Sequence, residues 1–309
     1  MRRVVSASLG SSKRDHEVRV SLLGEQFSIS RIGTDGDWER QAELLKELDG
    51  KVDAIGLGGI DLYLYAGGKR YTIRDAKKLI KDVKRTPVVD GSGLKNSLER
   101  ETVRYMVEDL KLPLAGKTVL MTSAVDRFGM AEALHEAGCK VMFGDLIYGL
   151  KIPVMIRSMR VFTLLAKTLL PIVTKMPFEM LYPTGSKQDK EPEEKYSRYY
   201  READVIAGDY LFVRKYMPAD MSGKWIVTNT VTPSDLKDMS ARGVELLVTT
   251  TPELEGRSFG TNVMEATIVA LTGKRPEEMT PSDYLRILRE VEFTPRIEWM
   301  NGKASSQQT

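Results

Sequence analysis

Residues 116–145 restrict the fold more than any other part of this sequence. They contain two β-type runs, at 116–121 and 140–143, on either side of a helical run at 129–137. A strand, a tight turn, a helix and a second strand within about thirty residues form a βαβ unit, which requires a parallel sheet. Further runs of buried-strand type alternate with helical runs at 204–207, 225–228 and 245–249. This alternation predicts an α/β fold in which helices cover both faces of a Rossmann-like parallel sheet.

The N-terminal third has a different pattern. Three short β-type runs, at 4–9, 17–23 and 27–32, predict a small meander, and a long helical pattern at 94–110 stops before Pro113. A chain of 309 residues exceeds the size at which one core stops growing, so we expect two domains. The expected parts are a smaller N-terminal α/β substrate domain at 1–112, a Rossmann-like nucleotide-binding domain at 113–275 with a helical insertion at 151–202, and a C-terminal helix and tail at 276–309.

Composition excludes several classes of site. The single cysteine, Cys139, and the two histidines, His16 and His135, predict neither a disulfide framework nor a metal centre. The 46 Lys and Arg residues against 43 Asp and Glu leave a net charge of +3, which gives no reason to expect a nucleic-acid partner. The opening run MRRVVSASLG is too short and interrupted for a signal peptide. We therefore expect a cytoplasmic protein.

The turn at 122–129 is the first candidate site. A helix that begins directly after a parallel strand presents backbone N–H groups to a phosphate, and an acid after the next strand accepts hydrogen bonds from a ribose. Asp145 lies 145 − 123 = 22 residues after Ser123, which is the right separation. A closed turn without a ligand is the alternative, because the usual glycines are missing. The candidate cofactor-binding residues are Thr122, Ser123, Asp126, Arg127, Gly129, Asp145 and Thr228.

The run Asp90-Gly91-Ser92-Gly93 is the second candidate site. A carboxylate flanked by glycines can orient a substrate hydroxyl or share a proton with it. Asp90, with Lys95 or Lys69, is therefore the expected catalytic group, and Ser92 is an expected substrate contact. The alternative is that Asp90 only caps the following helix.

The loop at 252–262 is the third candidate site, because an open α/β sheet places its binding loops between a strand and the next helix. Arg257, Ser258 and Asn262 supply cationic, hydroxyl and amide groups that suit an anionic or polyol ligand. An ordinary connection is the alternative.

Residues 151–178 contain five basic residues and no acidic one. Such a basic amphipathic helix suits an anionic membrane surface. We favour instead a helical insertion that covers the cleft or forms the dimer interface of a homo-oligomer.

The order of these pieces resembles the shikimate and quinate dehydrogenase-like group of two-domain NAD(P)-dependent oxidoreductases. The residues that carry the resemblance are Asp-Gly-Ser-Gly at 90–93, Gly-Lys-Thr-Val-Leu at 116–120, and the late segments 262–266 and 270–274. The resemblance implies NAD or NADP as cofactor and a small hydroxylated substrate near Asp90. It also places Glu265 where the family has a substrate-contacting glutamine, which implies a different charge preference.

The leading expectation is an NAD(P)-dependent dehydrogenase-like protein that acts on a small molecule. Two alternatives remain open. The first is a Rossmann-like group transferase that uses S-adenosylmethionine or a nucleotide-sugar, which needs the acid on the ribose but not the glycines. The second is a non-catalytic ligand-binding protein.

Overall fold

A computed structural model describes residues 1–177, 196–251, 253–254, 257–258 and 260–300. The chain forms two compact units. The first comprises Met1–Leu98, Lys167–Lys187 and Gly260–Phe293, and the second comprises Glu99–Ala166, Gln188–Phe259 and Thr294–Thr309. The units differ from the expected ranges, because the chain passes between them several times. Within the described parts of the chain, no helix has the length and apolar character that crossing a bilayer requires.

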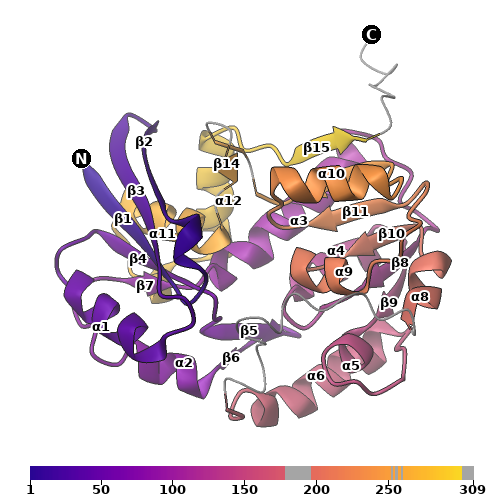
Figure 1. The fold of residues 1–309 in the computed structure, drawn as a ribbon, viewed down its shortest axis with the longest axis horizontal. Helices are drawn as coiled ribbons and strands as arrows, with labels where there is room; N and C mark the ends of the chain where they lie inside the picture. Colours follow the sequence, from indigo (N-terminus) through magenta and orange to yellow (C-terminus); the bar gives the residue numbers. More distant parts are fainter. Residues whose placement is uncertain (178–195, 252, 255–256, 259, 301–309) are drawn as a thin grey trace. The chain divides into compact units, whose positions relative to one another are not determined.

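The first unit is built on a five-stranded sheet with the order β2-β3-β1-β4-β7 (Figure 1). β1 pairs in parallel with both β3 and β4, and only β2 runs antiparallel. The expected meander is therefore wrong: β1 does not pair with the strand that follows it, because its apolar residues are buried at the centre of the sheet. The strand bounds are Arg2–Ser8 (β1), His16–Leu22 (β2), Glu25–Gly33 (β3), Ala54–Gly58 (β4) and Val88–Val89 (β7).

Helices and a hairpin complete the first unit. The capping residues are those that the sequence favours: Asp37 accepts a hydrogen bond from the Arg40 N–H, and Thr280 forms a capping box with Asp283. The helices are α1 (Trp38–Leu48), α2 (Arg74–Leu79), the start of α3 (Ser92–Glu108), α11 (Thr261–Thr272) and α12 (Pro281–Glu290). The hairpin consists of β5 (Tyr63–Ala66) and β6 (Lys69–Thr72).

The second unit is built on a six-stranded sheet with the order β15-β12-β11-β10-β8-β9. Five strands are parallel, and β15 is an antiparallel edge strand. The α/β class with parallel sheets is confirmed. In the Rossmann order, strands 2 and 3 both lie on one side of strand 1. In this sheet β8 comes first along the chain, and among the described residues β9 alone lies on the corresponding side of it. The strand bounds are Thr118–Met121 (β8), Lys140–Phe143 (β9), Val205–Ala207 (β10), Trp225–Thr228 (β11), Leu246–Thr249 (β12) and Arg296–Trp299 (β15).

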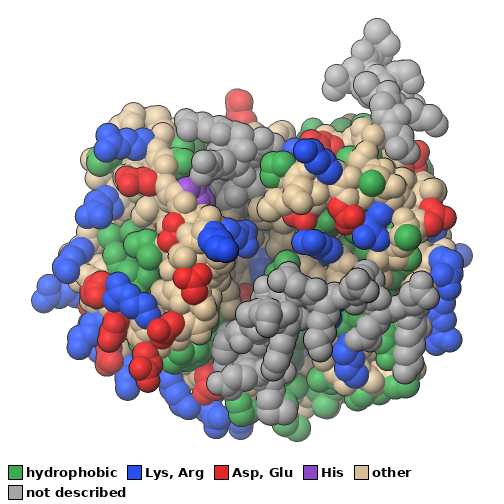
Figure 2. Space-filling model, viewed as in Figure 1, with side chains coloured by type: hydrophobic (Ala, Val, Ile, Leu, Met, Phe, Trp, Pro, Cys, Tyr) green, Lys and Arg blue, Asp and Glu red, His purple; other side chains and the backbone are tan. Residues whose placement is uncertain are grey.

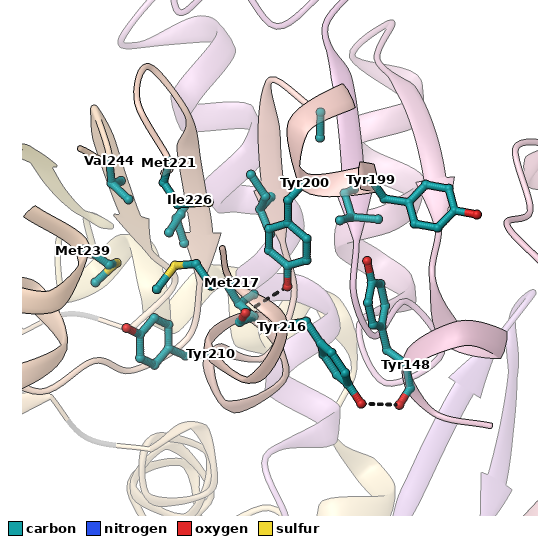
Figure 3. Close-up of a cluster of buried hydrophobic side chains, with 14 of the residues drawn as sticks. Tyr148, Tyr199, Tyr200, Tyr210, Tyr216, Met217, Met221, Ile226, Met239 and Val244 are labelled. Carbon is teal, nitrogen blue, oxygen red and sulfur yellow. Dashed lines mark hydrogen bonds between the residues drawn. The ribbon is translucent and has the colours of Figure 1, made fainter. Parts of the chain in front are cut away.

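Tyrosines dominate one side of the core of the second unit (Figure 3). Tyr200 is fully buried and donates a 2.9 Å hydrogen bond to the carbonyl of Val213, and Tyr216 donates a 3.3 Å bond to the carbonyl of Tyr148. These bonds satisfy hydroxyls that burial would otherwise leave without water. The helices of this unit are α4 (Phe128–Glu136), α5 (Asp145–Tyr148), α6 (Met159–Val173, which ends in the first unit), α8 (Ser197–Glu202), α9 (Tyr210–Tyr216) and α10 (Pro233–Ala241).

Candidate functional site

A pocket of ≈ 190 Å³ lies within the first unit, beside the carboxyl end of β7. The hairpin β5–β6, the first turn of α3, and helices α11 and α12 all contribute to its lining. This is the edge at which α/β sheets bind ligands, because strand ends and helix starts meet there. The polar side chains that face it include Tyr63, Arg70, Asn96, Glu265, Glu277 and Tyr284.

Asp90 positions two walls of this pocket. One carboxylate oxygen accepts hydrogen bonds from the backbone N–H groups of Leu62, at 2.6 Å, and Tyr63, at 3.0 Å. The other oxygen accepts from the N–H and the hydroxyl of Ser92, at 3.0 and 2.6 Å. Asp90 thus joins the hairpin to the start of α3, and Ser92, an expected substrate contact, is one of its donors. Four accepted bonds fit the helix-capping alternative better than proton transfer.

Glu265 is the buried acid of the pocket. It lies on α11 with 3% of its surface exposed, and its Oε1 accepts a 2.6 Å hydrogen bond from the Tyr284 hydroxyl. Its Oε2 is buried and has no hydrogen-bond partner among the described residues. Burial, and then the charge of Asp90, raise the pKa of Glu265 to about 8. The carboxyl group is therefore mostly protonated at neutral pH, and it can donate as well as accept a hydrogen bond.

Two glycines make room for this acid. A Cβ on Gly93 would lie 2.3 Å from Oε1 of Glu265 and 2.8 Å from the hydroxyl of Tyr284. Gly91 has a φ of +94°, and a Cβ there would lie 2.7 Å from the backbone nitrogen of Asn262, at the start of α11. The glycines of the 90–93 run thus allow α3 and α11 to approach each other.

The hairpin supplies an aromatic and basic wall. Tyr63 and Tyr65 alternate with buried residues along β5, so both lie on the face that lines the pocket. The guanidinium carbon of Arg70 lies 4.3 Å from the centre of the Tyr63 ring, and burial raises the pKa of both tyrosines. Sequence reasoning named the neighbouring Lys69 and missed the tyrosines. The alternation in Tyr-Leu-Tyr-Ala was the signal that could have found them.

The two lysines expected to assist catalysis do not line this pocket. The ammonium group of Lys95 lies 3.6 Å from a carboxylate oxygen of Asp61. That of Lys69 lies 5.4 Å from the centre of the Tyr71 ring. Of the expected substrate contacts, Ser92 and Glu265 line the pocket, whereas Asn262 donates a 2.8 Å hydrogen bond to the hydroxyl of Ser6. Arg257 and Ser258 form the short strand β14 (Arg257–Ser258), and their side chains lie outside the described parts of the structure.

The turn after β8 is closed by side chains of the second unit itself. Arg127 is 3% exposed, forms an ion pair with Glu99, and lies 3.1 Å from a carboxylate oxygen of Asp209. Asp126 lies 3.9 Å from the Arg127 Nε, and Gly129 is buried inside α4. The arginine therefore forms ion pairs with acids of the protein.

The hydroxyls and the acid expected to hold a nucleotide also bond within the protein. The Asp145 carboxylate accepts a 2.8 Å hydrogen bond from the Val125 N–H, and burial raises the pKa of Asp145 to about 6. The acid predicted to bind a ribose thus accepts a hydrogen bond from a backbone N–H group of the turn. The other hydroxyls bond to backbone groups: Thr122 to the carbonyl of Ala207, Ser123 to the N–H of Asp209, and Thr228 to the carbonyl of Gly208.

Comparison with family models gives two matches. The model described as "Domain of unknown function (DUF8754)" matches residues 93–300, and the model described as "Domain of unknown function (DUF8753)" matches residues 3–90. A search of curated proteins finds no match.

The solved structures that match this chain have low sequence identity and low TM-scores. A galactofuranose binding protein is 13% identical, covers 94% of this chain and 99% of its own, and has a TM-score of 0.38. A glucose-galactose binding protein from Geobacillus stearothermophilus is 9% identical, with coverages of 97% and 98% and a TM-score of 0.39. A 5-methylthioribose transporter solute binding protein from Thermotoga lettingae is 10% identical, with coverages of 97% and 86% and a TM-score of 0.40. At these scores the likeness carries no argument about the ligand of this chain.

The expected resemblance to shikimate and quinate dehydrogenases is wrong, and so is the oxidoreductase function drawn from it. The family models that match the chain, over residues 3–90 and 93–300, describe two other domains. The geometry gives the physical reason: the short motifs 90–93 and 122–129 serve as caps and closed turns, which many α/β proteins need.

Proposed function

We propose, for a chain that belongs to the DUF8754 family, that the pocket beside Glu265 binds a small, neutral, polyhydroxylated molecule without converting it. The observation that carries the proposal is the Glu265 carboxyl group, which is buried at the pocket with its Oε2 unpartnered among the described residues. A buried polar atom without a partner is costly, so a ligand that bonds to it is stabilised.

The charges around the pocket favour a neutral ligand. Asp90, Glu265 and Glu277 are acidic, and Arg70 is the basic residue in the described lining. An anion would meet the carboxylates of Asp90 and Glu277, which repel it at close range. A ligand hydroxyl can accept a hydrogen bond from a protonated Glu265 and donate one to an ionised Glu265, so it suits both states of the acid.

The remaining side chains fit a small polyol. Tyr63 and Tyr65 supply flat apolar faces next to polar hydroxyls, and Asn96 supplies an amide that both donates and accepts. The volume of ≈ 190 Å³ accommodates a ligand of monosaccharide size, below the usual range for drug-sized pockets.

Binding is favoured over catalysis because two of the groups suited to proton transfer, Asp90 and Tyr284, already form hydrogen bonds within the protein. Asp90 accepts four hydrogen bonds from the protein. Burial and the adjacent Glu265 keep the pKa of Tyr284 well above its ordinary value, so its hydroxyl remains a donor.

Calorimetric titration of the purified chain at pH 6 tests the proposal with three sets of ligands. The first set contains neutral pentoses, hexoses and inositols. The second and third sets contain sugar acids and amino sugars of matching size. We expect heat and thermal stabilisation with at least one neutral ligand. We expect this binding to be lost in Glu265→Ala and kept in the control Glu290→Gln, an exposed residue of α12 outside the pocket lining. Binding of sugar acids alone, or neutral binding that survives Glu265→Ala, would overturn the proposal.

A further inference from the structure

Helix α6 (Met159–Val173) presents apolar side chains to solvent. One side of the helix is buried along Phe162, Ala166 and Leu170, which are four residues apart. On the other side, Val161 is 49% exposed, and Leu164 and Ile172 are each 64% exposed. Pro171 lies inside the helix.

The segment that precedes α6 also exposes apolar side chains. Leu150, Ile152 and Val154 are 48%, 44% and 51% exposed. Among the described residues, nine large hydrophobic side chains are exposed, and six of them lie between 150 and 172. Figure 2 shows hydrophobic side chains along the lower edge of the view, where Figure 1 places α6. Such concentration marks a contact surface, since single exposed apolar residues are normally scattered.

The charge of this stretch has one sign. From 151 to 178 the sequence has five basic residues and no acidic one. Two of the cations are partnered: Arg157 forms an ion pair with Glu202, and Lys151 bonds to the Tyr216 hydroxyl. Arg160 and Lys167 are exposed on α6 and lie about 20° apart around its axis, with Leu164 about 40° from Arg160. The cations thus border the apolar stripe.

We propose that α6 and residues 150–154 form a surface that lies on an anionic lipid bilayer. Exposed apolar side chains would enter the headgroup boundary, and the flanking cations would meet anionic headgroups. A second copy of the chain fits less well, because an interface formed by the same face of two copies would bring like charges together. This surface is separate from the pocket residues, so ligand binding at Glu265 and vesicle binding succeed or fail independently.

Co-sedimentation of the full chain with two kinds of vesicle tests this surface: phosphatidylcholine alone, and phosphatidylcholine mixed with phosphatidylserine. We expect binding to the mixed vesicles only, weakening as the salt concentration rises. Leu164→Glu should weaken it at least about 10-fold, and Arg160→Gln combined with Lys167→Gln about 10- to 30-fold.

Two controls match these variants. Leu211→Glu changes an apolar residue of α9 that is 55% exposed, and Lys46→Gln combined with Lys77→Gln removes two exposed cations elsewhere. Both should bind mixed vesicles as the unaltered chain does. The absence of binding to mixed vesicles, equal binding to neutral ones, or an equal loss in Leu211→Glu would overturn the proposal. If analytical ultracentrifugation shows a dimer that becomes monomeric in Leu164→Glu, the surface is an interface with a second copy of the chain instead.

Discussion

The hydroxyl of Tyr284 donates a 2.6 Å hydrogen bond to Oε1 of Glu265, and this bond joins α12 to α11 within the first unit. Each residue is 3% exposed. Tyr284 also belongs to an apolar cluster with Leu94, Leu98 and Ile287, so its ring is held by packing while its hydroxyl faces the acid. The position of the carboxyl group in the pocket therefore depends on the packing of the C-terminal helix.

Replacing Tyr284 by Phe removes the donor and leaves both oxygens of Glu265 without a side-chain donor in the described structure. We expect Tyr284→Phe to lose about 1–3 kcal/mol of unfolding free energy, the usual cost of an unsatisfied buried polar group. Tyr210→Phe is the matched control, because Tyr210 is also 3% exposed but its buried hydroxyl has no partner among the described residues. Urea unfolding at pH 6 measures both. An equal loss in the two variants would contradict the role given to this bond.

Glu265 makes the stability of the protein depend on pH. The pKa of its carboxyl group is about 8 in the folded chain and about 4.5 in the unfolded one, so between these values the folded state binds more protons. The contribution of Glu265 to the free energy of unfolding therefore falls as the pH rises from about 4.5 through about 8, by at most about 1.4 kcal/mol per pH unit. Glu265→Gln cannot titrate.

The stability of Glu265→Gln relative to the unaltered chain should therefore increase steadily across this pH window. Denaturation at several pH values measures the difference. Groups such as Asp145, whose pKa is about 6, titrate in both proteins and cancel in the comparison. A difference that stays constant from pH 5 to pH 8 would show that Glu265 is not buried as an acid.

Local signals predicted the elements of this fold, and distant contacts decided the site. The 4–9 and 27–32 runs became β1 and β3, and Thr280 begins α12 as its capping pattern predicts. The sequence pattern does not predict that β1 pairs with β3, in parallel, and not with β2. Strand partners depend on which residues the whole sheet buries, and periodicity gives only the face of a single strand.

The candidate site shows the same limit. Glu265 and Ser92 were singled out and do line the pocket, but Tyr284 was not. Its partner lies 284 − 265 = 19 residues away on another helix, so helical spacing cannot indicate their bond. Asp145 has the expected place after β9; one of its carboxylate oxygens accepts a hydrogen bond from the Val125 N–H, and the other is buried without a partner among the described residues. A spacing places an acid near a turn without telling which donors it will bond to.

Gly93 should not tolerate a side chain. Gly93→Ala places a Cβ 2.3 Å from Oε1 of Glu265, closer than any real contact of this kind. Alanine favours helices by about 1 kcal/mol over glycine, but overpacking costs about 1–3 kcal/mol and displaces the acid from the pocket. We expect a net loss of stability and of ligand binding. In the Glu265→Ala background, Gly93→Ala should cost at least about 1 kcal/mol less. Denaturation of the unaltered chain, the two single variants and the double variant measures this difference. An unchanged cost would show that the added Cβ clashes with a group other than Glu265.

Arg127 should contribute to stability because it closes the turn after β8. Its side chain is 2% exposed, and that of its partner Glu99 is 1% exposed. Arg127→Met leaves this acid buried without its cation, which typically costs about 3–5 kcal/mol. Arg104→Met is the control, since Arg104 is 42% exposed in its ion pairs with Glu101 and Glu108, and such pairs contribute about 0–1 kcal/mol. Guanidinium unfolding at pH 7 compares the two. If Arg127→Met costs no more than Arg104→Met, the guanidinium is not needed to hold the turn closed.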